Sequence, residues 1–198
     1  KAALQAAGLE LDKFEFLVCE GAVLKRDGAT LRLGSGGGPL LLDEEMGDEP
    51  DALKFHFLRQ TPGKIAEIEL EVARRDDETN PAYAALLVPS RLARLSREAQ
   101  GQIGTTEATT EVEWLPGERE LARLVGLWPD EAAEAAARRD PSRIARFVLE
   151  LGEASRGLLA KSSPSQAPLA QRLQLLRAAG NVAAGALKLL GIEAREKF

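Results

Sequence analysis

The hydrophobic pattern of the last third of the chain predicts two long amphipathic helices. Apolar side chains recur every three or four residues, which places them on one face of an α-helix. Asp140-Pro141 gives the first helix an N-cap followed by proline, and Gly191 suits the end of the second. A Ser- and Pro-containing connection, 162–168, joins the two, so we expect an antiparallel pair within a bundle. The two apolar stripes are Ile144, Phe147, Val148, Leu151, Leu158 and Leu159, and then Leu169, Leu173, Leu176, Ala183, Leu187 and Leu190.

The pattern near the start of the chain indicates strands instead. Residues 14–24 are largely apolar and partly β-branched, as in a buried strand. Asp27-Gly28 is a strong hairpin signal, and residues 30–33 supply the returning strand. The glycine-rich stretch 34–39 cannot hold a regular element.

The middle of the chain is predicted to be mostly helical. One helix opens at Pro50 and runs to about Arg59, whereas the alternating residues 65–72 fit either a strand or an extended lead-in to a helix. From Asn80-Pro81 the pattern is helical, with a kink expected at Pro89 and a mobile loop at 101–113. Two further helices, 117–126 and 129–139, are expected to separate at Trp128-Pro129. The fold class that follows is mainly α, a helical bundle with a small N-terminal β-hairpin appendage.

The amino-acid composition limits the kinds of site that this chain is expected to contain. The 198 residues are 44% hydrophobic and 29% charged, an ordinary globular balance. Aromatic residues are only 5%, whereas Ala, Leu, Arg and Glu dominate, and this mix favours helices. Neither paired cysteines nor paired histidines exist, so we expect no disulfide, no metal site and no cofactor. His56, the single histidine, has no partner for catalysis and is expected to be a helix residue that packs near the core of the protein. No apolar run approaches the ~18 residues of a membrane span, so the cytoplasm is the default compartment and no membrane partner is expected.

Arginines at helical spacing are the strongest candidate for a binding site. The net charge is −5, so a nucleic-acid site has to be a local patch. Residues 138–188 carry nine cations and only three acids. Such stripes suit phosphate contacts, although they are also compatible with ordinary solvated helix faces. One stripe is Arg91, Arg94 and Arg97, and the other is Arg139, Arg143 and Arg146.

Five short motifs, in order, resemble arginyl-tRNA synthetases. Residues 15–28 end in a sequence similar to the family's "RDG" hairpin. Asp51-Ala52-Leu53-Lys54 resembles the "DALR" tetrapeptide, and Asn80-Pro81-Ala82-Tyr83 resembles the "NPVYY" helix start, whose closing arginine is matched by Arg91. Residues 140–145 resemble "EPHRIA", and the segment from Leu189 to Phe198 resembles the "LLGI-AP-RM" tail. The resemblance implies the end of a synthetase catalytic domain at 1–47, followed by a DALR-type anticodon-binding bundle at 48–198.

The departures from the family pattern bear on activity. In the family, the hairpin leads into a "KMSKR-G" signature loop whose lysines stabilise ATP phosphates. At the matching positions this chain has Arg32 and Ser35 for the two lysines and Gly36 for the arginine, and only Gly38 is retained. The family's "HIGH" motif is absent. The resemblance therefore implies a chain with no catalytic residues of its own.

The RNA-facing positions have also lost aromatic residues. The family's helix after "NPVYY" carries further Gln, Tyr and His, where this chain has alanine, leucine and proline and keeps only Tyr83 for stacking on bases. Three functions stay open. The chain is a non-catalytic module that binds tRNA or another nucleic acid, a subunit of a synthetase whose partner supplies the ATP site, or a protein-interaction module that no longer binds RNA.

Overall fold

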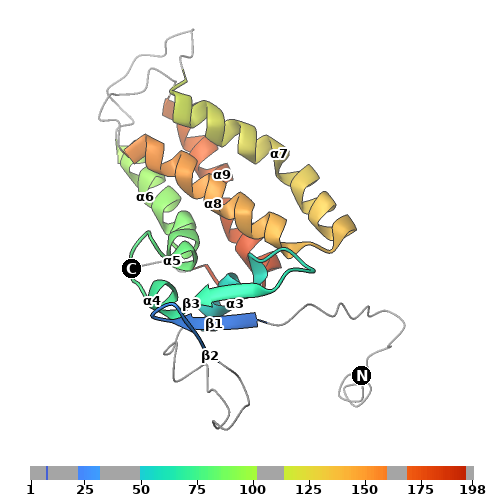
Figure 1. Cartoon of the computed structure of the whole chain (residues 1–198). Helices are drawn as coiled ribbons and strands as arrows, with labels where there is room; N and C mark the ends of the chain where they lie inside the picture. Colours follow the sequence, from blue (N-terminus) through green and yellow to red (C-terminus); the bar gives the residue numbers. More distant parts are fainter. Residues whose placement is uncertain (1–7, 9–21, 32–49, 102–113, 160–168, 195–198) are drawn as a thin grey trace.

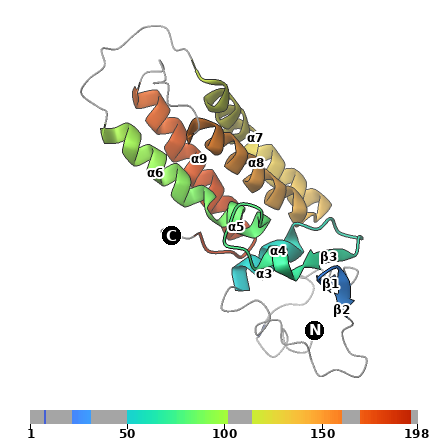
Figure 2. The ribbon, with the colours of Figure 1, turned by 60° about the vertical axis from the view of Figure 1, so that its left-hand side comes forward.

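The structure, a computed structural model, describes residue 8 and residues 22–31, 50–101, 114–159 and 169–194. Four long helices pack lengthwise into a bundle (Figure 1): α6 (Val88–Gly101), α7 (Pro116–Arg138), α8 (Pro141–Leu159) and α9 (Leu169–Leu189). Helix α6 lies along α9 and α7 lies along α8, as both views show (Figure 2). The expected mainly α fold class is confirmed.

The predicted apolar stripes form the core of this bundle. Phe147, Val148, Leu151 and Leu158 of α8 are buried, and Ile144 is partly buried against them. In α9 the buried members are Leu173, Leu176, Ala183 and Leu187, and Leu190, directly after the helix, is buried as well. The side chains of Leu159 and Leu169 lie outside the described residues, as do the segments 14–21, 32–49, 102–113 and 160–168, which include the expected glycine-rich stretch and both expected loops.

Both predicted helix ends of the pair are confirmed. The Asp140 carboxylate accepts hydrogen bonds from the Ser142 backbone N–H (3.0 Å) and hydroxyl (2.5 Å), which is an N-cap. At the end of α9, Gly191 adopts φ +69° and the Ile192 N–H reaches back to the Leu187 carbonyl at 3.0 Å. The left-handed turn reverses the chain, and Ile192 is buried directly after it.

One prediction was wrong: α7 is a single helix that continues through Pro129. A proline inside a helix removes one amide donor and costs ~3 kcal/mol, but it does not have to end the helix. Here both sides of Pro129 are held against the bundle. Leu121 and Leu124 are buried before it, the Trp128 ring lies 5.2 Å from the Phe147 ring of α8, and Ala135 is buried after it. The packing of α7 against the bundle therefore outweighs the tendency of Pro129 to end a helix.

A small sheet covers one end of the bundle (Figure 1). Strands β1 (Ala22–Arg26) and β2 (Ala29–Leu31) form the predicted hairpin, with Asp27 and Gly28 both at positive φ in its two-residue turn. Strand β3 (Ala66–Glu69) pairs parallel to β1, so the order is β2-β1-β3. The third strand was one of two alternatives for 65–72. It leads directly into α4 (Leu70–Ala73), so the segment is a strand followed by a helical turn.

Short helices connect the sheet to the bundle. Helix α3 (Pro50–Leu58) follows its predicted bounds closely, and α5 (Pro81–Leu86) is separated from α6 at Leu87. The interruption expected at Pro89 therefore falls two residues earlier, because Pro89 fits the first turn of α6. A second small core of Leu24, Ile68, Leu70 and Ala73 lies between the sheet and α3. None of the described helices is both long and apolar enough to cross a membrane.

Candidate nucleic-acid interface

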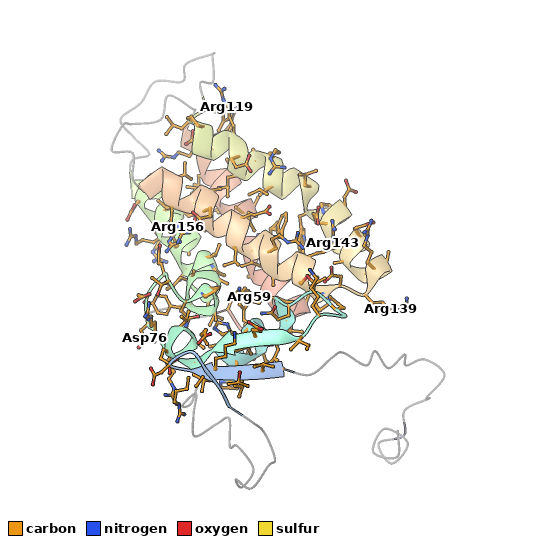
Figure 3. The ribbon with its side chains drawn as sticks, in the orientation of Figure 1. Arg59, Asp76, Arg119, Arg139, Arg143 and Arg156 are labelled. Carbon is orange, nitrogen blue, oxygen red and sulfur yellow. The ribbon has the colours of Figure 1, made fainter. Side chains whose placement is uncertain are left out.

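The arginines expected on α8 do not all lie on that helix. Arg139 is the left-handed residue that ends α7 (φ +53°), and it stands at the corner before α8 (Figure 3). Arg143 is half-buried and makes an ion pair with Glu131 of α7 at 2.8 Å. Arg146 is exposed and has no partner among the described residues. The α8 stripe thus consists of Arg143 and Arg146, of which only Arg146 is unpaired.

The α6 stripe is also partly neutralised. Arg91 is 10% exposed and is bound to Glu78, a residue of the loop before α5. Arg94 makes an ion pair with Glu98, one turn further along, at 3.2 Å. Arg97 is exposed and has no partner in the described part of the chain.

Glu78 joins two helices, an arrangement that the sequence analysis missed. Its carboxylate also accepts from Arg156 Nη1 of α8 at 2.5 Å, and Arg156 in turn is bound to Glu153. Burial opposes ionisation of Glu78, but hydrogen bonds and charge from Arg156 and Arg91 prevail and hold its pKa below the usual range. Arg156 belongs to the basic region 138–188, yet nothing local to it signals a partner 78 residues away.

The free arginines face different hollows. Arg146 lines one hollow between α7 and α8 with Arg123, Arg143 and Glu150, and a second one beside the end of α3. Arg97 lines a separate groove between α6 and α9, together with Arg177 and the small residues Ala93 and Gly180. The two stripes therefore border different surfaces and do not merge into one patch.

His56 has a structural place, as predicted. It is 5% exposed in α3, and its Nε2 lies 3.0 Å from Oδ1 of Asn80. Burial lowers the His56 pKa, and the bond to Asn80 opposes this only in part. Because the Asn80 oxygen is an acceptor, Nε2 carries the proton. Tyr83, the remaining aromatic candidate, is half-buried in α5 and is engaged with another residue. The degenerate loop positions Arg32, Ser35, Gly36 and Gly38 lie outside the described residues.

The class of protein that this arrangement defines is a four-helix bundle with a small sheet at one end and hollows that are lined in part by arginines. Residues 86–198, which contain all four of these long helices, match the model of the DALR anticodon binding domain. The chain belongs to this family.

Arginyl-tRNA ligases are among its relatives. The chain is 29% identical to the arginine–tRNA ligase of Desulfitobacterium hafniense and 24% identical to that of Oceanobacillus iheyensis. Each match covers all of this chain and 37% of the relative, so the chain spans little more than a third of the length of these proteins. The fold is similar to that of a Campylobacter jejuni structure assigned to arginyl-tRNA synthetases (TM-score 0.73, 18% identity, all of this chain and 44% of that one). It is also similar to the Thermus thermophilus arginyl-tRNA synthetase (TM-score 0.64, 21% identity, 91% of this chain and 35% of that one). The resemblance seen in the sequence is confirmed.

Proposed function

We propose that this chain is a tRNA-binding module that contacts the phosphate backbone through exposed arginines and does not aminoacylate tRNA by itself. The observation that carries the proposal is the match of residues 86–198 to an anticodon-binding family. Helices α6 and α8 of this bundle bear Arg97 and Arg146, whose charges are free among the described residues.

The other candidates contribute in a different way. Arg91, Arg94 and Arg143 are each paired with a carboxylate, so a phosphate has to displace that carboxylate before they bind it. Such an exchange of one anion for another contributes little net energy. Arg139 stays in the proposed interface at the α7–α8 corner, and Tyr83 stays as its one stacking residue. Phosphate contacts carry no sequence information, so we expect binding with weak selectivity among tRNAs.

The absence of catalysis is proposed from the sequence. With Ser35 and Gly36 in place of the family's lysine and arginine, the signature loop keeps Arg32 as its sole cation and has lost most of the charge that stabilises ATP phosphates. We expect no arginine-dependent ATP–pyrophosphate exchange by the purified chain. Exchange that appears only after a copurifying protein is added would favour the second function, a subunit of a synthetase.

The test of RNA binding is a mobility-shift titration with total tRNA and with a DNA duplex of similar length, each at two salt concentrations. We expect tRNA to bind more tightly, and binding to weaken as salt rises because counterions are released. Absence of binding to either ligand at low salt would refute the proposal and would favour a protein-interaction module, in line with the net charge of −5.

A further inference from the structure

We propose that the hollow between the end of α3 and the first half of α8, here called the α3–α8 cleft, binds the phosphate backbone of tRNA. Arg59, Thr61, Pro81, Ser142, Arg146 and Leu149 line it. Arg59 directly follows α3 and Arg146 lies in α8, so the two charges approach a ligand from different parts of the chain. The inference rests on the proposed tRNA binding and adds Arg59, which lies in neither of the arginine stripes.

The backbone on the α3 side of the cleft is well anchored. The Arg59 N–H extends α3 by bonding to the Phe55 carbonyl at 2.9 Å, and Phe55 is fully buried. The guanidinium itself is exposed and has no hydrogen-bond or ion-pair partner among the described residues. In Figure 3 it lies between α3 and α8. The backbone of Arg59 is therefore held in place, and its guanidinium does not have to leave another residue of the described chain before it binds a phosphate.

On the α8 side of the cleft, Arg146 likewise combines an anchored backbone with an exposed guanidinium that is unpaired among the described residues. Arg146 stands between Ala145 and Phe147, which are buried, so the position of its backbone is set by the core. Ser142, one turn earlier, donates its hydroxyl to Asp140 at the start of α8. Arg146 also borders the neighbouring hollow with Arg123 and Arg143. That hollow also contains Glu131 and Glu150, and its Arg123 and Arg143 are paired with carboxylates, so Arg146 is its unpaired cation among the described residues.

Charge and lining favour a phosphate chain over other ligands. The six residues of the cleft include two arginines and no carboxylate. Its apolar lining is limited to Pro81 and Leu149, which is too little for the apolar walls typical of small-molecule sites. It also lacks the aromatic anchors that are enriched at the centres of protein interfaces. Paired guanidinium groups suit the bidentate recognition of phosphate oxygens.

The test compares three single substitutions in the whole chain. Arg59→Ala and Arg146→Ala each remove one cation from the cleft. Arg119→Ala is the matched control, because Arg119 is an exposed arginine without a partner in the described residues, at the far end of α7 (Figure 3). Binding of a tRNA transcript is measured from low to moderate salt. Thermal melts confirm that each variant remains folded.

We expect Arg59→Ala and Arg146→Ala each to weaken tRNA binding about five- to tenfold at low salt and to lower the slope of log K against log salt by about one. Arg119→Ala should change affinity by about twofold or less. Arg59→Lys should restore part of the loss, since the charge returns without the planar fork. If the wild type binds but both cleft variants behave like Arg119→Ala, the cleft proposal is wrong and tRNA binding stands. If the wild type does not bind, both are wrong.

Discussion

Asn80 holds the loop before α5 through four side-chain hydrogen bonds, and we predict that Asn80→Ala is strongly destabilising. The side chain is 3% exposed. Its oxygen accepts from the Ala82 N–H and from His56 Nε2, both at 3.0 Å. Its amide nitrogen donates to the carbonyls of Ala73 and Arg75, both at 2.9 Å. One residue therefore caps α5 and ties it to α3 and to the end of α4.

The magnitude follows from the groups that lose their partner. Loss of the cap at Ala82 costs ~1 kcal/mol. The buried ring N–H of His56 and the buried carbonyl of Ala73 are also left without their bond, at about 1 kcal/mol or more each. The total of about 3 kcal/mol corresponds to a change of more than ~100-fold in the unfolding equilibrium. For a chain of this length it lowers the melting temperature by about 6–12 °C.

The assay is urea and thermal unfolding followed by circular dichroism. Asn181→Ala is the control, because Asn181 is an exposed residue of α9 and has no bond of this kind. We expect the control to be neutral or slightly stabilising, since alanine is the better helix former. A melting temperature for Asn80→Ala that equals that of Asn181→Ala would show that the four bonds contribute nothing net.

Three further predictions concern stability. Because burial depresses the pKa of His56 below its usual 6.5, the unfolded chain binds the proton more readily. The free energy of unfolding should therefore fall as the pH drops below about 6.5, and His56→Gln, which can still donate to Asn80, should flatten this dependence between pH 7 and 5 in urea titrations. Pro129→Ala should raise the unfolding free energy by about 1–3 kcal/mol by restoring an amide donor in α7, and an unchanged or lower value would mean that the proline is locally favourable. Gly126→Ala should stabilise by about 0.5–1 kcal/mol, since an added Cβ meets nothing within 4 Å. Gly152→Ala should destabilise, because its Cβ would lie 3.0 Å from Cγ2 of Val88, which is fully buried and has no free space to shift into. Equal melting temperatures for the two glycine variants would contradict the packing argument.

The features that could be predicted from the sequence are those set by neighbours along the chain. The stripes of α8 and α9, the Asp140 cap, the Gly191 end and the Asp27-Gly28 turn each depend on residues within one or two turns of each other. Their geometry follows from helical periodicity and from backbone angles that few residues adopt. The resemblance to arginyl-tRNA synthetases could be recognised for the same reason, since each of its motifs is short and contiguous.

Tertiary structure decided the features that depend on distant residues. The continuity of α7 through Pro129 comes from its packing on α8, and the parallel pairing of β3 with β1 joins residues more than 40 positions apart. Which arginines are unpaired and which are paired with a carboxylate also depends on distant residues. Arg143 and Arg156 find their carboxylates on other elements, whereas Arg146 meets none in the described chain and comes to border one cleft with Arg59. The spacing of charged residues along one helix shows which face of that helix each side chain occupies. Whether a carboxylate from another element lies opposite a given arginine depends on how the whole chain packs. For this reason the fold is needed to show which arginines remain unpaired and can bind a ligand.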